Sequence, residues 1–204
     1  MPGSALNDKN ISVDFFYLPS GILGGDLLDV IPVTENKYGM IIADVSGHNI
    51  GASLIMAETR TLIQASKDQS RKPAELVQSL NDFFYDDLTQ TELFISMFYL
   101  SINVANNRFR YANAGHNLPL HFHAETETIT ELDAEGLILG VKKEFPYIEE
   151  LGELKKGDIL LLYTDGITEA ERSDGEFFGV SRLRDILLEA KKKNAQESID
   201  YLLV

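Results

Sequence analysis

The chain has 204 residues, enough for one domain with a substantial core, and no stretch reads as a linker between halves. Its composition, 44% hydrophobic and 25% charged, is typical of a globular protein rather than a disordered one. Acidic residues outnumber basic ones 32 to 18, and the formal charge of −14 disfavours nucleic acid and anionic membranes as partners. The absence of Cys excludes disulfides and thiolate nucleophiles and suits a cytoplasmic location.

The first segment, residues 1–10, is small and polar, and we expect it to be a linker or a cloning remnant. The start shows no signal-peptide progression, and no apolar run approaches the roughly 18 residues of a membrane helix. We therefore expect residues 11–204 to form one domain without an export signal or a membrane span.

Strand patterns dominate the chain and are interrupted by a helical block. We expect strands at 11–20, 38–47, 92–104, 108–116, 118–124, 128–133, 147–154 and 157–166. Ala105-Asn106-Asn107 predicts an antiparallel hairpin, because Asn tolerates positive φ. Helices are predicted at 52–66, at 73–88, where Pro73 suits the first turn, and at 180–193, where basic residues close the last turn. Strands in blocks with helices between them favour an α+β fold.

Three acidic positions share one local pattern. Asp26 follows two glycines, Asp44 ends an apolar run three residues before Gly47, and Asp165 ends another just before Gly166. Glycine lets the backbone approach a ligand closely, and carboxylate and carbonyl oxygens are the ligands that Mg²⁺ or Mn²⁺ prefers. Each aspartate taken alone is more typical of a turn or a helix cap. Together they indicate a divalent-metal site.

A set of longer motifs resembles a known family. "GGDLLD", "IIADVSGHNIGASLIMA", "FRYANAGHNLPL", "LILGV" and "GDILLLYTDGITEA" with "GEFFG" follow one another in the order and spacing of the metal-dependent protein serine/threonine phosphatases, the PPM superfamily, in its SpoIIE-like bacterial branch. The resemblance runs from about Tyr17 to Leu188. It implies a sandwich of two antiparallel β-sheets flanked by helices, an αββα arrangement.

The resemblance also implies a site and a reaction. Asp26, Asp44 and Asp165 would bind two Mn²⁺ or Mg²⁺ ions and be the catalytic residues, with Asp44 bridging both ions and the Val45 carbonyl adding an oxygen. Asp29 would play a supporting role. Two such ions activate a water for in-line attack on phosphorus, so no protein nucleophile is needed.

Other polar residues near these motifs have competing interpretations. His48 and His116 are expected near the site as ligands, hydrogen-bond donors or general acids, or as scaffold residues. We expect Glu169 in the first turn of a short helix, where a carboxylate matches the helix dipole. His121 and His123 alternate on one strand and are interpreted as a solvent-facing pair.

The chain departs from the family pattern mainly at its end. The family closes with a strand bearing paired aspartates, whereas "SIDYLLV" ends first, so the domain is expected to be truncated before its last metal-binding strand. An upstream sensor or receiver domain is expected in the full-length chain. The expected substrate is a small regulatory phosphoprotein of the anti-sigma-factor antagonist type.

Two alternatives remain open at this point. One is a regulatory module of the same fold that binds a phosphoprotein or a sister domain without turning it over. The other, a two-metal phosphodiesterase, is disfavoured by the acidic charge and by the lack of a His-rich ligand set. The sequence leaves the oligomeric state open, a homodimer included.

Overall fold

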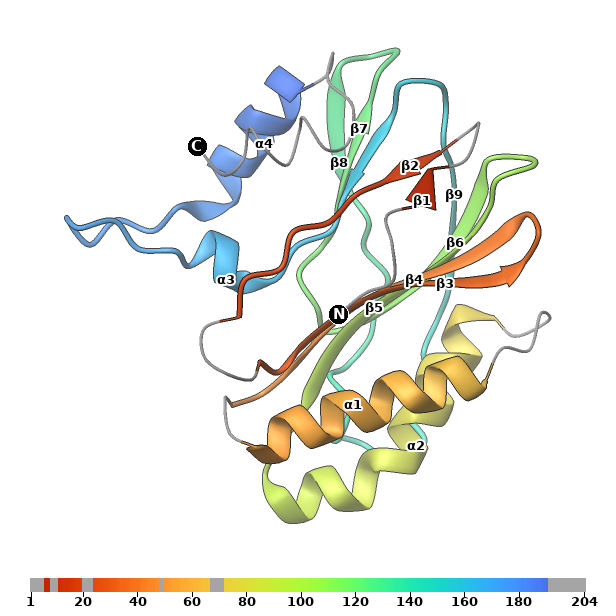
Figure 1. Ribbon diagram of the computed structural model, residues 1–204, viewed down its shortest axis with the longest axis vertical. Coiled ribbons are helices and arrows are strands. Elements are labelled where there is room, and N and C mark those ends of the chain that lie inside the picture. The colour runs from red at the N-terminus through yellow and green to blue at the C-terminus, as the bar shows by residue number, and fades with distance from the viewer. Residues whose placement is uncertain (1–5, 8–10, 20–23, 48–49, 67–71, 191–204) are drawn as a thin grey trace. The chain divides into compact units, whose positions relative to one another are not determined.

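The computed structural model describes residues 6–7, 11–19, 24–47, 50–66 and 72–190 (Figure 1). The chain divides into two compact units, each assembled from segments far apart in the sequence. Unit 1 comprises residues 1–3, 18–116 and 133–153, and unit 2 comprises residues 4–17, 117–132 and 154–204.

A five-stranded antiparallel sheet forms the centre of unit 1, in the order β3-β4-β5-β6-β9. Its strands are β3 (Asp26–Thr34), β4 (Lys37–Val45), β5 (Ile95–Asn103), β6 (Arg108–Ala114) and β9 (Glu150–Glu153). The hairpin predicted at 105–107 is confirmed, since Asn103 pairs with Arg108 and Asn107 has a φ of 58°. The left-handed conformation at Asn107 is one that Asn tolerates better than most residues.

The sequence patterns did not predict β3. Asp26, Asp29 and Pro32 interrupt its apolar residues, so the segment lacks the continuous run that marks β4. Proline is compatible with β3 because this strand lies at the edge of the sheet, where one side of the backbone needs no ladder partner. Register with β4 was needed to recognise it as a strand.

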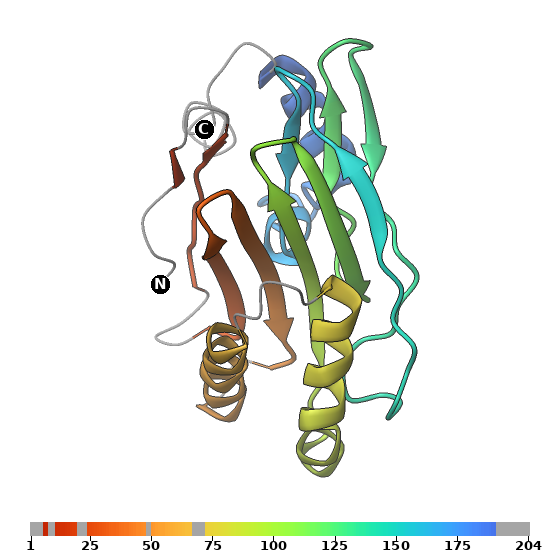
Figure 2. The same cartoon turned by 90° about the vertical axis from the view of Figure 1, so that its right-hand side faces the viewer.

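Two helices cover one face of this sheet (Figures 1 and 2). Helix α1 (Ile50–Ala65) contacts β3 and β4, and helix α2 (Pro73–Thr91) contacts β5 and β6. Both helices were predicted, with ends that differ by up to three residues. Alternate strand residues point toward the helices. The buried core on this face includes Leu27, Ile41, Ala43, Val45, Ile63, Leu76, Val77, Phe84, Ile95 and Met97.

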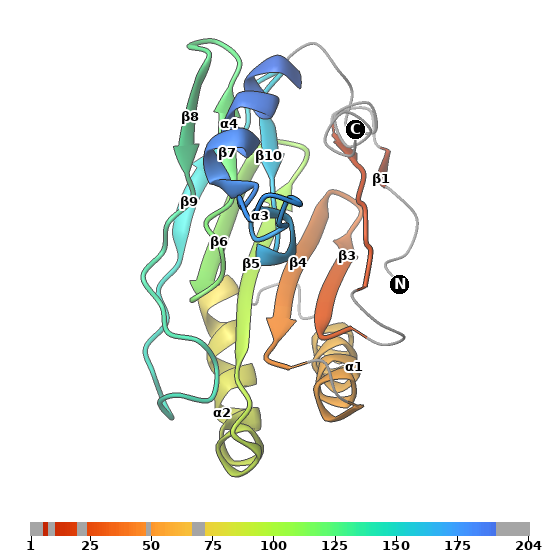
Figure 3. The same cartoon turned by 90° about the vertical axis from the view of Figure 1, so that its left-hand side faces the viewer.

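Unit 2 is built around a three-stranded antiparallel sheet in the order β10-β7-β8. Its strands are β7 (Leu120–His123), β8 (Thr128–Glu131) and β10 (Ile159–Leu161). Helix α4 (Gly179–Glu189) contacts β7 and buries Leu183 and Leu187 against Leu120, Phe122 and Tyr163 (Figure 3). The short helix α3 (Asp165–Thr168) precedes it. The basic residues predicted to close the last helix, at 191–193, lie outside the described residues.

The strand expected at 11–20 is wrong over most of its length. Only Ser12–Val13 is a strand, β2, which pairs with β1 (Leu6–Asn7) in unit 2. Residues 14–19 are irregular, and Phe16 and Leu18 are 50% and 76% exposed. An apolar run predicts a strand only where a partner strand is available, and the described part of the chain offers none beyond β1.

Antiparallel sheets together with α1 to α4 confirm the α+β class. Among the described residues, no helix is both long enough and apolar enough to cross a bilayer.

Candidate metal centre

Asp26 and Asp44 lie directly opposite each other at one end of the β3–β4 pair. Opposed residues of an antiparallel pair project from the same face, so the two carboxylates are cross-strand neighbours. Both residues are half-buried. Like charges directly opposite each other repel, and a cation bound between the two carboxylates would offset this repulsion.

Gly25 brings a set of oxygen atoms to the same place. A Cβ added at Gly25 would lie 2.5 Å from the Val45 carbonyl oxygen, 3.2 Å from the Gly47 carbonyl oxygen and 3.4 Å from Asp44 Oδ1. The Val45 amide donates to the Gly25 carbonyl at 3.2 Å. The two backbones approach this closely because residue 25 has no side chain. Carbonyl and carboxylate oxygens therefore converge beside Asp26.

The turn that follows Asp44 is tied to the next strand in the sheet. The Ser46 amide donates to the Phe94 carbonyl at 2.9 Å, and the Phe94 amide donates to Ser46 Oγ at 3.0 Å. The Ser53 hydroxyl of α1 donates to the Gly24 carbonyl at 3.3 Å. These bonds hold both backbone segments that carry the aspartates.

Ser96 extends the row of polar residues to a third strand. It pairs with Asp44 across β4 and β5, and its Oγ is 2.8 Å from Nδ1 of His116. Asp26, Asp44, Ser96 and His116 thus follow one line across the sheet. Ser96 cannot be recognised from the sequence, because its only signal is the register that places it opposite Asp44.

The "NAGH" motif builds the loop that holds His116. Asn113 donates from Nδ2 to the His116 carbonyl at 3.1 Å, and its Oδ1 accepts from the His116 amide at 2.8 Å. Gly115 has a φ of +65°, and a Cβ there would lie 2.5 Å from Ile138 Cγ2. His116 is buried, and this loop fixes its ring beside Ser96. The structure thus places the His116 ring next to the row, and its role as ligand, donor, general acid or scaffold residue stays a prediction.

Asp29 belongs to the opposite face of β3. It is three residues after Asp26 on β3, so the two side chains point to opposite faces of the strand. Asp29 is 2% exposed and lies on the face covered by α1. Its Oδ2 accepts from Arg60 Nε at 2.8 Å and from Gln64 Nε2 at 2.9 Å. Asp29 therefore ties α1 to β3 on the face of the strand opposite Asp26, and its expected supporting role at the metal site stays a prediction.

Asp165 belongs to unit 2, where it is exposed and begins α3. Its meeting with Asp26 and Asp44 stays a prediction. The expectation for Glu169 is wrong, because α3 begins at Asp165 and Glu169 follows its last helical residue. A helix of four residues that begins at Asp165 puts Glu169 at its C-terminal end, where its amide donates to the Asp165 carbonyl at 2.7 Å.

Two other histidine expectations have different outcomes. His48 lies outside the described residues. The solvent-facing interpretation of His121 is wrong, since His121 is 4% exposed and its Nε2 is 3.1 Å from Asp158 Oδ2. Alternation along a strand shows which residues share a face, but not whether water reaches that face.

Comparison with known proteins places the chain. The family model described as stage II sporulation protein E (SpoIIE) matches residues 34–204. The chain belongs to the SpoIIE family. Relatives of this SpoIIE-family chain include the phosphoserine phosphatases RsbU and RsbP of Bacillus subtilis (strain 168). RsbU is 27% identical to the chain, over 94% of the chain and 56% of the length of RsbU. RsbP is 31% identical, over 82% of the chain and 42% of the length of RsbP. The chain thus spans about half the length of these relatives.

Solved structures share the fold of this SpoIIE-family chain. The SiaA-PP2C domain of Pseudomonas aeruginosa matches with a TM-score of 0.78 and 20% identity, over 91% of this chain and 74% of that one. The PP2C phosphatase domain of SpoIIE from Bacillus subtilis, solved with a fragment of its regulatory domain, matches with a TM-score of 0.72 and 21% identity, over 90% and 53%. The expected PPM-type fold class is confirmed.

Proposed function

We propose that the chain is a metal-dependent phosphatase acting on phosphoserine or phosphothreonine in a small regulatory protein. The observation that carries the proposal is the opposed pair Asp26 and Asp44 at the end of β3 and β4, with the Val45 and Gly47 carbonyl oxygens beside them. Such an arrangement concentrates negative charge and oxygen ligands at one point. The chain has no Cys to act as a nucleophile, which agrees with a mechanism that uses an activated water.

The donor set around Gly25 fits Mg²⁺ or Mn²⁺, because its atoms are carboxylate and carbonyl oxygens. We propose that Asp26, Asp44 and the Val45 carbonyl hold two such ions together with Asp165. When bound, the ions supply a water of lowered pKa and positive charge for the phosphoryl oxygens.

The remaining residues of the row orient these ligands. The Ser96–His116 hydrogen bond fixes the strand position opposite Asp44, and the two bonds between Asn113 and the His116 backbone fix the loop that supplies His116. Gly25 keeps open the space in which the oxygen atoms converge. Ligands that are held in place before binding bind a cation without further ordering cost.

The proposed substrate and the proposed domain arrangement of the full-length protein rest on the relatives and on the family resemblance. RsbU and RsbP are phosphoserine phosphatases, and both are longer than the segment matched here. A phosphorylated partner of the anti-sigma-factor antagonist type therefore fits best, with an upstream sensor or receiver domain in the full-length protein. A cytoplasmic location and a homodimer stay predictions.

The substitution Asp44→Asn tests the proposal. It keeps the size of the side chain and removes the charge expected to bridge the ions. We expect hydrolysis of an aryl phosphate with Mn²⁺ to fall by more than about a hundredfold, since even partners outside the ligand set typically contribute about 10–100-fold. We also expect Mn²⁺ to raise the melting temperature of the original chain, because it binds the native state, and to lose this effect in the variant.

The matched control is Asp86→Asn, which makes the same chemical change at an exposed position of α2. This variant should keep both the turnover and the Mn²⁺ response. A folded Asp44→Asn protein with normal turnover would contradict the assigned centre. Binding of the phosphoprotein without turnover by the original chain would favour the regulatory module instead.

A further inference from the structure

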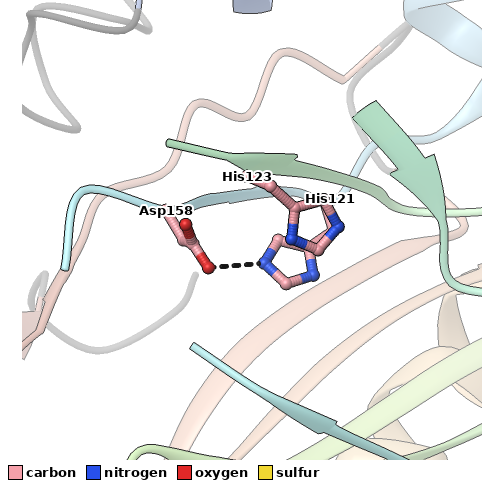
Figure 4. A group of neighbouring side chains, drawn as sticks. All are labelled: His121, His123 and Asp158. Carbon is pink, nitrogen blue, oxygen red and sulfur yellow. Dashed lines mark hydrogen bonds and ion pairs between the residues drawn. The ribbon is translucent and has the colours of Figure 1, made fainter. Parts of the chain in front are cut away.

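Three potential metal ligands come together in unit 2, and none of them belongs to the proposed phosphatase centre (Figure 4). His121 and His123 are on β7, and Asp158 immediately precedes β10. One nitrogen of each imidazole and one oxygen of Asp158 all lie within 4.8 Å of one another. The rings of the two histidines are 3.9 Å apart between centroids.

The sheet register explains why these residues meet. His121 and His123 are two residues apart on β7, so their side chains share a face. Ile159 pairs with Phe122, which places Asp158 across from His123 when the ladder is extended by one residue. The other face carries the apolar cluster that includes Leu120 and Phe122 and packs with α4. The sheet therefore has one apolar face and one face on which His121, His123 and Asp158 come together.

The cluster is held in position by surrounding hydrogen bonds. The Asp158 carboxylate accepts from the Ala124 amide at 2.9 Å and from the Lys155 amide at 2.9 Å. The Nε2 atom of His123 is 2.8 Å from the Thr130 hydroxyl on β8. Metal-binding histidines typically use their second nitrogen for such a contact, which fixes the ring and its tautomer.

The donor atoms of the cluster suit a cation. Burial lowers the pKa of His121, and its hydrogen bond with Asp158 opposes this shift. Burial alone would raise the pKa of Asp158, but the amides of Lys155 and Ala124 and the contact with His121 hold it below its usual value. The Asp158 side chain is 1% exposed. A buried carboxylate beside two imidazoles offers a cation mixed nitrogen and oxygen donors.

We propose that His121, His123 and Asp158 bind one Zn²⁺ ion that joins β7 to the turn before β10. Two imidazoles and one carboxylate form a typical set of zinc ligands, whereas Mg²⁺ prefers oxygen donors. Ligand bonds of about 2.0–2.1 Å place the atoms of a tetrahedral site about 3.3 Å apart, close to the 3.1 Å between His121 and Asp158. His123, the half-buried member, moves inward to complete the set, and His121 binds through the nitrogen that faces Asp158, with its ring proton on the other nitrogen.

Calorimetric titration of the metal-free full chain with Zn²⁺, in excess Mg²⁺, tests the proposal. Mg²⁺ occupies oxygen-rich sites and leaves the imidazoles free, so we expect one Zn²⁺ per chain. The substitution His123→Gln should weaken binding by at least about tenfold. Glu125→Gln is the matched control, because Glu125 is an exposed carboxylate on the same hairpin whose partner is Lys155. It should leave the affinity unchanged.

Imidazole NMR of the original chain gives a readout that needs no variant. The chain has four histidines, and Zn²⁺ should shift the signals of His121 and His123 alone. The proposal would be overturned if Zn²⁺ did not bind saturably in the presence of Mg²⁺. Equal affinity of a folded His123→Gln protein, or a response of His48 or His116 in place of the β7 pair, would overturn it as well.

Discussion

At the scale of single residues, the candidate phosphatase centre depends on Gly25. Three oxygen atoms lie within 3.4 Å of the position that a Cβ would take there, and two of them belong to the backbone. Backbone atoms cannot rotate away as the end of a flexible side chain does. The space beside Asp26 is therefore kept open by the absence of a side chain.

The substitution Gly25→Ala tests this dependence. The added methyl group would meet the Val45 carbonyl oxygen at 2.5 Å, so β3 and β4 must separate locally. We expect loss of Mn²⁺-dependent turnover by more than about tenfold and a loss of stability of about 1–3 kcal/mol. Aryl phosphate hydrolysis and thermal unfolding measure the two effects.

Gly166→Ala is the control for stability, since the atom nearest to its added Cβ is Thr164 Oγ1 at 3.8 Å. It should unfold near the temperature of the original chain. An unchanged melting temperature and unchanged turnover in Gly25→Ala would show that the two strands tolerate the methyl group.

At the scale of elements, one buried ion pair connects α1 to the strand that carries Asp26. Asp29 is 2% exposed and Arg60 is 37% exposed, so the carboxylate is shielded from water while the guanidinium is partly solvated. Gln64 and the Val30 amide complete the hydrogen bonds of Asp29. A buried carboxylate that loses its cation is costly, because its charge remains without compensation.

The substitution Arg60→Met removes the cation and keeps an aliphatic chain over the strand. We expect the free energy of unfolding to fall by about 2 kcal/mol, which is typical for a hydrogen bond to a charged group. Urea denaturation measures the change.

Lys143→Met serves as the comparison, because its pair with Asp86 is exposed on both sides. Its cost should stay within about 1 kcal/mol. If the two substitutions cost the same, Asp29 would not depend on Arg60 for its charge compensation.

At the scale of the whole molecule, the chain presents a strongly acidic surface and two compact units with separate apolar clusters. A centre made of oxygen ligands and cations distinguishes phosphomonoesters poorly from one another. Selection among proteins must therefore use contacts on other parts of the surface.

Kinetics on two substrates test this. We expect kcat/KM for the cognate phosphoprotein to exceed that for a short phosphopeptide cut from it by at least about tenfold, because the peptide lacks the remote contacts. An unrelated phosphopeptide of equal length is the control and should match the cognate peptide. Equal values for the phosphoprotein and its peptide would place recognition within the peptide itself.

The family, helices α1, α2 and α4 and most strands of the two larger sheets could be predicted from the amino-acid sequence. The motifs around Asp26, Asp44 and Asp165 and the Asn-rich hairpin are local features, and local chemistry decides turn type and strand periodicity. The strand β3 could not be predicted in this way, because polar residues and Pro32 interrupt its apolar pattern and its pairing with β4 is long-range information.

Which residues meet in space depends on the tertiary fold. Ser96 is opposite Asp44, although they are far apart in the chain, and Asp29 faces α1 while Asp26 faces away from it. His121 and Asp158 meet across 37 residues and are buried, against the solvent-facing expectation. Register, the choice of face and burial result from long-range pairing and packing, which a periodic pattern in one segment does not contain.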